Sequence, residues 1–353
     1  MSKLILSLCC LAAVASAAEI PKPFEGDYTL RDVQFHSGEK AAAIKLHYRT
    51  LGKPLTGAGG KVENAVLILH GTGGSSEQFF QNHFAQELFG PGQLLDPAKY
   101  FAIMPDGIGH GNSTKPSDGL HMRFPHYAYE DMVEAQYRLV SEGLHVNHLR
   151  LVMGTSMGGM QTWMWGERYP DFVDALMPLA SLPWPITGRN YVWRRMVSDA
   201  IREDPEWRDG EYRTEPRGLK MATYLLIVMG STPIDWQYQA PTRELAEEFY
   251  RKTISERMAR RGLDANDLLY QVDASRDYDP RPGLEKIRGR LIAVNSADDE
   301  INPPELGIME REIRRVPHGR YVLIPASEKT HGHSSHTWAA LWKDSLRELL
   351  DGQ

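Results

Sequence analysis

The sequence predicts an α/β protein with a mostly parallel, doubly wound sheet and a helical insertion over one edge of it. Short, continuously apolar runs recur along the chain, as expected for strands covered on both faces of a parallel sheet. Helical patterns separate several of these runs, and such alternation is typical of a doubly wound sheet. One long stretch, from about residue 182 to residue 272, contains no convincing parallel strand and has mainly helical character.

The strands and helices follow one another in a simple order. An alternating stretch comes first, in which Ile44, Leu46 and Tyr48 are interleaved with polar residues, and it predicts a β-hairpin over about residues 28–48. The predicted buried strands are 65–69, 101–104, 149–153, 175–179, 291–294 and 321–324, and the predicted helices between or after them are 129–144, 160–168 and 337–350.

The insertion at 182–272 falls before the last two predicted strands and is rich in aromatic residues. Ligands of open α/β sheets bind at the carboxyl edge of the strands, so we expect the insertion to cover that edge as a lid. Most of its aromatic side chains are expected to pack in its own core; they are Trp184, Trp193, Trp207, Tyr224 and Trp236.

Length and composition fit one large globular domain. The chain has 353 residues, of which 42% are hydrophobic and 24% charged. A formal net charge of -6 gives no electrostatic reason to expect binding to nucleic acid or to an anionic membrane surface. The sequence leaves the oligomeric state open, with a homodimer among the outcomes.

The first 17 residues have the pattern of an export signal. Lys3 is followed by a short apolar stretch over 4–14 and by Ala15-Ser16-Ala17, a small-x-small cleavage pattern. The apolar stretch is too short for a stable spanning helix of roughly 20 residues, so we expect a secreted or periplasmic protein with no stable membrane insertion. An uncleaved, membrane-anchored N-terminus is the alternative.

Both cysteines, Cys9 and Cys10, lie inside this signal. The mature protein is therefore expected to contain none, which excludes a cysteine nucleophile, a thiolate metal site and any disulfide.

The strongest motif is Gly154-Thr155-Ser156-Met157-Gly158-Gly159. It follows the predicted strand 149–153 and precedes the predicted helix from Met160, which is the strand–turn–helix setting of a G-x-S-x-G nucleophile elbow in the α/β-hydrolase fold. An ordinary phosphate-binding turn would need a G-x-G-x-x-G or G-K-[ST] pattern, and neither is present. Ser156 is therefore the predicted nucleophile.

A second glycine-rich loop, His70-Gly71-Thr72-Gly73-Gly74, follows the first buried strand. In this fold such a loop supplies one amide of an oxyanion hole, and the residue after the nucleophile supplies the other. The predicted donors are the backbone amides of Thr72 and Met157.

The acid and the base are expected after the last two strands, because the triad of this fold runs Ser, acid, His along the chain. Asp298 and Asp299 follow the strand 291–294, and the D-x-x-x-P spacing to Pro303 favours Asp299. Three histidines, His331, His333 and His336, follow the strand 321–324, and the preceding glycine favours His333 as the base.

Two competing interpretations of the histidines are weaker. A metal site would need a nearby cysteine or an H-x-x-x-H pattern on a helix, and neither is present, so no metal and no cofactor is expected. His110 lies in the glycine-rich loop after the second buried strand, where a structural role is favoured.

These motifs together resemble the homoserine O-acetyltransferases, a branch of the α/β-hydrolase superfamily. The similar segments are GTSMGGMQTWMWGERY from Gly154, AIREDPEWRDGEY from Ala200, DMVEAQ from Asp131 and HYRTLG from His47. The resemblance covers most of the chain after the signal and implies the same fold, a lid, and a Ser–Asp–His mechanism on Ser156, Asp299 and His333.

The substrate residues of that family are not retained. Ser334 stands where the family has the aspartate that binds the homoserine amine, and the family's carboxylate-binding arginine and its lid tyrosine fall at Thr223 and Gly230. Without buried counter-charges a charged amino acid would stay unpaired in the site. In addition, acetyl-CoA is a cytoplasmic metabolite, whereas this chain carries a predicted export signal.

The sequence therefore predicts a serine enzyme that hydrolyses an acyl ester or thioester of a small molecule through an acyl-enzyme. Acyl transfer to a hydroxyl acceptor is the first alternative, and a non-catalytic binding protein on the same fold is the second. The aromatic residues of the insertion favour a mainly apolar or aromatic acyl pocket.

Overall fold

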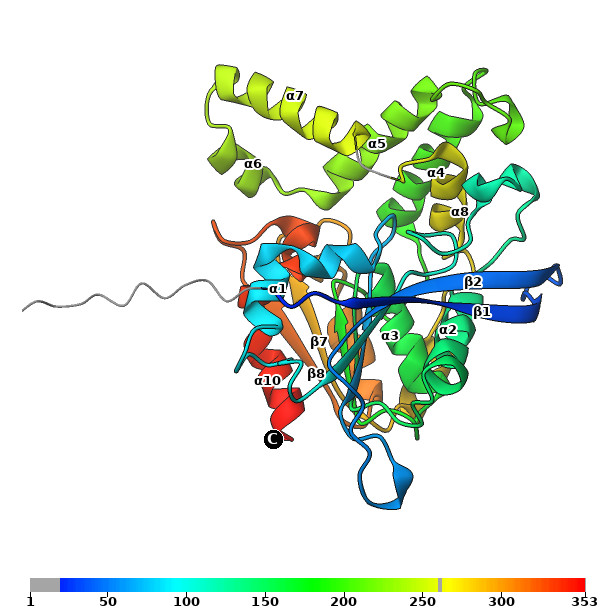
Figure 1. Ribbon diagram of the computed structural model, residues 1–353. Helices are drawn as coiled ribbons and strands as arrows, with labels where there is room; N and C mark the ends of the chain where they lie inside the picture. Colours follow the sequence, from blue (N-terminus) through cyan, green and yellow to red (C-terminus); the bar gives the residue numbers. More distant parts are fainter. Residues whose placement is uncertain (1–19, 260–261, 353) are drawn as a thin grey trace, which may run out of the picture.

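Eight strands form one sheet in the order β1-β2-β4-β3-β5-β6-β7-β8 in the computed structural model, which describes residues 20–259 and 262–352 (Figure 1). Strands β1, β2 and β4 pair antiparallel, and the other neighbours pair parallel. The strands are β1 (Phe24–Gln34), β2 (Lys40–Leu51), β3 (Ala65–Leu69), β4 (Phe101–Pro105), β5 (Leu151–Thr155), β6 (Ala175–Leu179), β7 (Arg290–Ser296) and β8 (Gly319–Ile324). The predicted fold class is confirmed.

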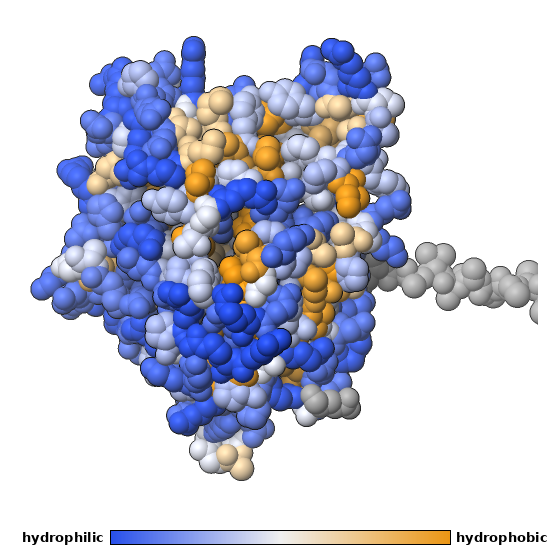
Figure 2. Space-filling model, turned by 180° about the vertical axis from the view of Figure 1, so that it is seen from behind, coloured by the Kyte–Doolittle hydropathy of each residue, from blue (hydrophilic) through white to orange (hydrophobic). Residues whose placement is uncertain are grey.

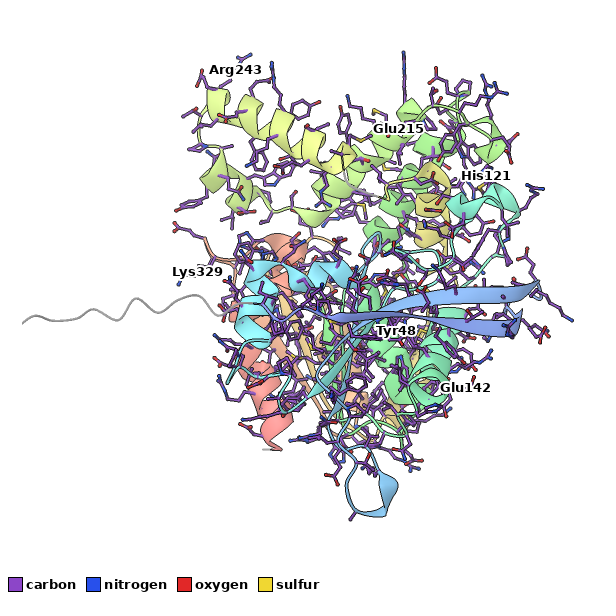
Figure 3. The ribbon with its side chains drawn as sticks, viewed as in Figure 1. Tyr48, His121, Glu142, Glu215, Arg243 and Lys329 are labelled. Atoms are coloured by element: carbon purple, nitrogen blue, oxygen red, sulfur yellow. The ribbon has the colours of Figure 1, made fainter. Side chains whose placement is uncertain are left out.

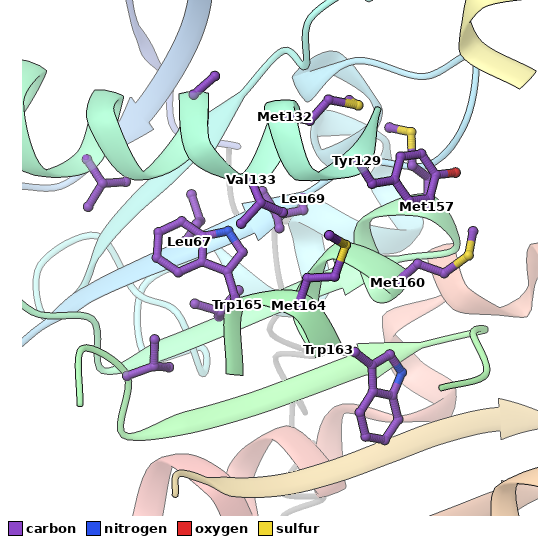
Figure 4. Close-up of a cluster of buried hydrophobic side chains, with 14 of the residues drawn as sticks. Leu67, Leu69, Tyr129, Met132, Val133, Met157, Met160, Trp163, Met164 and Trp165 are labelled. Atoms are coloured by element: carbon purple, nitrogen blue, oxygen red, sulfur yellow. The ribbon is translucent and has the colours of Figure 1, made fainter. Parts of the chain in front are cut away.

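Helices cover both faces of the sheet. The side chains of β3 show why, since Leu67 and Leu69 point to one face while Val66 and Ile68 point to the other, and all of them are buried. Helices α2 (Tyr129–Arg138) and α3 (Met157–Arg168) pack on the first face, and α1 (Asn82–Leu88) and α10 (Lys343–Asp351) pack on the second. Figure 4 shows α2 and α3 filling the first face with methionine and tryptophan side chains.

Along the described part of the chain, five α-helices follow β6 and precede β7, and they lie above the carboxyl ends of the strands (Figure 1). They are α4 (Gly188–Arg202), α5 (Arg217–Gly230), α6 (Pro233–Gln239), α7 (Arg243–Met258) and α8 (Ala265–Asp273). We call them the helical insertion. Helices α4, α5 and α8 share a small core of their own, in which Val197, Leu219 and Leu268 are buried.

The outer part of the insertion, which includes α6 and α7, is more exposed to solvent than the rest. Helices α6 and α7 contain no buried residue, and Tyr191, Met221, Val228 and Tyr238 are exposed. Figure 2 shows apolar side chains at the surface in the upper half of the molecule, where the insertion lies. The core of the molecule therefore lies around the sheet, and α8 joins the insertion to it, because Tyr270 of α8 packs in the same core.

Several predicted boundaries were wrong; the helix predicted at 129–144, for example, is α-helical only to Arg138 and continues as a π-helix over 139–143. The strand predicted at 149–153 is β5 at Leu151–Thr155, because Leu149 forms only an isolated bridge with Val173. The helix predicted from Met160 already begins at Met157. The helix predicted at 337–350 begins only at Lys343, because 3₁₀ turns occupy 332–337 and 339–341.

No helix in the described part of the chain is long and apolar enough to cross a membrane. The predicted export signal, residues 1–17, lies outside the described residues.

A buried carboxyl group joins the insertion to the rest of the domain. Asp267 of α8 accepts hydrogen bonds from the backbone amide and the hydroxyl of Ser117, at 2.8 and 2.7 Å. Burial, together with the nearby Asp264, raises the pKa of Asp267 to about 7. Because the unfolded carboxyl ionises near pH 4, the folded state holds a proton that the unfolded state releases, so this group stabilises the fold below about pH 4 and that contribution is lost as the pH rises through about 7.

We predict that Asp267→Asn removes this penalty, because an amide keeps both contacts to Ser117 without a charge. The free energy of unfolding is expected to rise by about 1–2 kcal/mol at pH 8 and to stay unchanged near pH 4. Urea unfolding at the two pH values measures the difference, with Asp118→Asn in the adjacent exposed position as the control. An equal effect at both pH values would contradict the assignment.

Candidate active site

Ser156 forms the whole turn between β5 and α3. Its backbone has φ 54° and ψ -109°, a combination that costs a non-glycine residue free energy and is typical of a strained functional turn. Its amide donates to the Leu179 carbonyl of β6 at 2.9 Å. Because the turn is this tight, the side chain leaves the carboxyl edge of the sheet, as predicted for a nucleophile elbow.

The glycines around Ser156 are required by close backbone contacts. A Cβ on Gly154 would lie 2.1 Å from the Gly158 carbonyl oxygen, and one on Gly158 would lie 2.1 Å from the Leu69 carbonyl oxygen. A Cβ on Gly159 would lie 2.5 Å from the Leu179 carbonyl oxygen. The helix therefore begins directly after the serine and packs on β3 and β6 without intervening side chains.

His333 and Asp299 complete a line of hydrogen bonds that starts at Ser156. Nε2 of His333 lies 2.8 Å from the Ser156 hydroxyl, and Nδ1 lies 2.8 Å from Oδ2 of Asp299. The loops after β5, β7 and β8 supply the three residues. The structure thus brings together the favoured residue from each predicted set.

Asp299 is held as an ionised carboxylate. Burial alone would raise its pKa, but the adjacent His333 and hydrogen bonds from His333, Asn302 and Ile301 outweigh burial, so the pKa lies below its ordinary value. The Asn302 amide donates to Oδ2 at 3.0 Å and also to the Ala180 carbonyl at 2.9 Å. Sequence reasoning missed Asn302, although Asn302-Pro303 is a recognisable turn signal.

Asp298, the competing acid, does not contact the histidine. It accepts hydrogen bonds from the hydroxyls of Ser296 and Thr330, the latter at 2.8 Å, and from the Gly332 amide at 3.2 Å. Gly332 has φ 57°, and a Cβ there would lie 2.9 Å from the Ser231 carbonyl oxygen. Asp298 therefore fastens the loop that carries His333, and the glycine lets this loop pass beneath the insertion.

The other two histidines have different environments. His331 lies 3.2 Å from the Asp235 carboxylate of α6 and stacks on Trp338, so it joins this loop to the insertion. In Figure 3, Lys329 marks the loop just before it, beneath the helices that precede Arg243. His336 packs edge-on against His333. No group of three or more metal-ligating side chains is arranged for a metal among the described residues.

The predicted oxyanion loop lies against the nucleophile. A Cβ on Gly71 would be 3.5 Å from the Ser156 Cβ. The amide of Met157 opens helix α3, where the first amides of a helix have no intrahelical acceptor. Gln78, which sequence reasoning missed, supports the loop because its amide donates to Thr155 Oγ1 at 2.9 Å and its carbonyl oxygen accepts from the Gly71 amide at 3.4 Å.

His110, judged structural from the sequence, is buried beside His70 and contacts the Ile108 carbonyl through Nδ1 at 2.9 Å. It does not line the cavity described next.

A cavity of about 1060 Å³ opens over Ser156 and His333, between the sheet edge and the insertion. Its apolar wall comes from both parts of the chain and includes Met160, Leu182, Trp184, Leu226, Met229 and Val272. Thr72 and Gly73 of the predicted oxyanion loop line it together with Ser156. The site can therefore hold a small organic molecule against the Ser156 hydroxyl.

Comparison with known proteins agrees with this arrangement. A family model described as the alpha/beta hydrolase fold matches residues 64–330. The chain belongs to the α/β-hydrolase family. A probable acyltransferase of Methanothermobacter thermautotrophicus is 31% identical to it over 295 residues, which span 82% of this chain and 86% of the relative.

One further relative places this α/β hydrolase within the family, and a solved structure shows the same fold. A homoserine O-acetyltransferase of Pelobacter propionicus is 36% identical over 302 residues, covering 77% of this chain and 79% of the relative, so the chain falls in the homoserine O-acetyltransferase-like branch. The crystal structure of an acetylester hydrolase from Corynebacterium glutamicum superposes with a TM-score of 0.77 at 23% identity, over 93% of this chain and 96% of that one, and shows the same fold.

His336 provides a test of the burial around the site. Burial, with His333 nearby, lowers the pKa of its imidazole to about 3. Above pH 6.5 the ring is neutral in the folded and unfolded states alike. As the pH falls below 6.5, the unfolded chain gains a proton that the folded chain does not, so stability is lost.

We predict that His336→Phe makes the fold less sensitive to acid. Between pH 7 and pH 4.5 the variant is expected to lose about 1–2 kcal/mol less stability than the wild type, as urea unfolding at the two pH values would measure. The exposed His318, replaced in the same way, is the control. The same acid sensitivity in both the His336 variant and the wild type would refute the buried, neutral state.

Proposed function

We propose that this α/β hydrolase is a serine esterase that hydrolyses small acyl esters or thioesters through an acyl-enzyme. The observation that carries the proposal is the pair of 2.8 Å contacts that link Ser156, His333 and Asp299 at the floor of the cavity. A serine bonded to an imidazole that is itself oriented by a carboxylate is the arrangement that activates a hydroxyl for attack.

In the first half-reaction, the Ser156 oxygen forms a bond to the acyl carbon and His333 takes the serine proton. The bond from the acyl carbon to the leaving alcohol or thiol then breaks, and His333 gives its proton to that group. In the second half-reaction, water attacks the acyl-enzyme, His333 takes the water proton and returns it to Ser156, and the carboxylic acid leaves. Asp299 holds the imidazole in the required orientation and stabilises its cationic form.

The negative charge on the acyl oxygen would be stabilised by the amides of Thr72 and Met157. The position of Gly71 beside Ser156 and the start of α3 at Met157 support this assignment. Each such donor typically contributes a factor of about 10² to 10³ to the rate. The mechanism requires no metal ion or cofactor.

Water is proposed as the acceptor because the cavity wall has lost the residues that bind homoserine in the resembling family. Thr223, Gly230 and Ser334, which stand at those positions, all line the cavity. The Thr223 hydroxyl donates to the Leu219 carbonyl at 2.8 Å, and the Ser334 hydroxyl donates to the Gly230 carbonyl at 3.2 Å. Their hydrogen bonds are therefore made within the protein, and none of them carries a charge.

The predicted location of the protein also favours water over acyl transfer from acetyl-CoA. We propose that residues 1–17 direct the protein to the periplasm or the exterior, where acetyl-CoA is not the expected acyl donor. The helical insertion is proposed to act as the lid of the site. A homodimer stays a prediction, which the molar mass from analytical ultracentrifugation would test.

Acyl transfer to a hydroxyl acceptor remains the second candidate, since relatives are named as acyltransferases and homoserine O-acetyltransferases. Product analysis with and without homoserine or a simple alcohol separates the two. Formation of free acid at the same rate in both cases supports hydrolysis, whereas formation of the acylated acceptor at its expense supports transfer. A non-catalytic binding protein would show neither product.

We predict graded losses of esterase activity on 4-nitrophenyl acetate. Asp299→Asn is expected to lower kcat by about 10³- to 10⁴-fold with little change in KM, because the imidazole loses its orientation. Asp298→Asn is expected to lower it by only about 10- to 100-fold, because this residue holds the loop and touches no reacting atom. Equal losses in the two variants would argue against separate roles for the two aspartates.

A further inference from the structure

One arginine of the cavity wall has no acidic partner. Arg194 of α4 is partly buried and lines the cavity. Its Nε donates to the Asn190 side-chain oxygen at 3.0 Å, and its Nη1 donates to the Val272 carbonyl at 3.3 Å and the Ser275 hydroxyl at 3.1 Å. All of these acceptors are neutral. Among residues 20–259 and 262–352, no carboxylate lies within ion-pairing distance of Arg194.

Two other charged side chains of the same wall differ in their partners. Arg189, one and a half turns earlier on α4, pairs with the Glu300 carboxylate at 3.3 Å. The carboxylate of Asp264 accepts from the Tyr212 hydroxyl and caps the first turn of α8. Arg194 thus brings to the cavity wall a positive charge that forms no ion pair within the described residues.

Arg194 is also connected to the floor of the site. The carbonyl that it binds belongs to Val272, and the preceding residue, Gln271, reaches the oxyanion loop. A Cβ on Gly73 would lie 3.6 Å from Oε1 of Gln271, whose amide donates to the Gly109 carbonyl at 2.8 Å. The end of helix α8 therefore contacts both the Arg194 guanidinium, through Val272, and the loop 70–74 beside Ser156, through Gln271.

A partly buried cation is stabilised by an anion to which it can donate charge-assisted hydrogen bonds, and carboxylates accept such bonds from a guanidinium. Nη2 of Arg194 makes no hydrogen bond within the described residues, and the cavity is large enough for an ester with a further polar group. We propose that Arg194 is a specificity-determining residue that selects esters carrying a compact anionic group, such as a carboxylate. The inference rests on the proposed esterase function and names its substrate class.

The test compares matched pairs of charged and neutral esters with the purified full-length enzyme. Mono-4-nitrophenyl glutarate against 4-nitrophenyl valerate places the charge on the acyl side. The pair 4-acetoxybenzoate against 4-tolyl acetate places it on the leaving group. We expect the wild type to prefer the charged member of one pair by about 10- to 100-fold in kcat/KM, the factor that a charge-assisted hydrogen bond supplies.

Arg194→Gln is expected to abolish that preference through a rise in KM, with less than about a threefold change on the neutral ester. Arg194→Lys is expected to restore part of it, because a point charge remains without the planar pair of donors. Arg195→Gln is the matched control, since Arg195 follows on the same helix but is exposed and pairs with Asp199. It is expected to leave both substrates unchanged.

Three results would overturn the inference. One is a wild type without preference for either charged ester, and another is an equal loss on charged and neutral esters in Arg194→Gln. The third is an equal loss of the preference in the Arg195 control. Failure of the proposed function is distinct from all three, because a folded wild type would then hydrolyse none of the four esters.

Discussion

The close contact between the Ser156 turn and the neighbouring strands is the constraint on which the rest of the site depends. Without side chains at Gly154, Gly158 and Gly159, helix α3 can approach β3 and β6 until the chain has only one residue in which to turn. Ser156 then takes a strained conformation that the sheet holds in place through the Leu179 carbonyl. The same geometry places the start of α3, with its free amides, directly after the Ser156 side chain.

The remaining residues of the site are held by hydrogen bonds between loops. Two consecutive aspartates act differently, because Asp299 faces His333 whereas Asp298 turns back to bind Thr330 and the Gly332 amide. The loop of Asp298 and Asp299 therefore both orients His333 and anchors the loop that carries it. The insertion adds a further contact, between Asp235 and His331, so the loop that carries His333 is held on two sides.

Much of this could be predicted from the sequence, because the signals were local. The buried strands are continuous apolar runs, and Ser156, Asp299 and His333 follow strand ends in the order the fold requires. The role of Asp298, and those of Gln78 and Asn302, depend on which side chains meet across loops, and spacing along the chain does not encode that. The sequence pattern placed the start of α3 at Met160 instead of Met157, because the turn at Ser156 is tighter than the glycine content alone implies.

The cavity explains why family resemblance and substrate need not agree. Thr223, Gly230 and Ser334 stand at the positions where the resembling family has its homoserine-binding residues, and all of them line the cavity. The hydroxyls of Thr223 and Ser334 donate to backbone carbonyls of the protein itself. The measurement that tests the account most directly is labelling of the purified protein with a fluorophosphonate probe. We predict that wild type is labelled and that Ser156→Ala and His333→Ala are not; a folded wild type that resists labelling would contradict an activated serine.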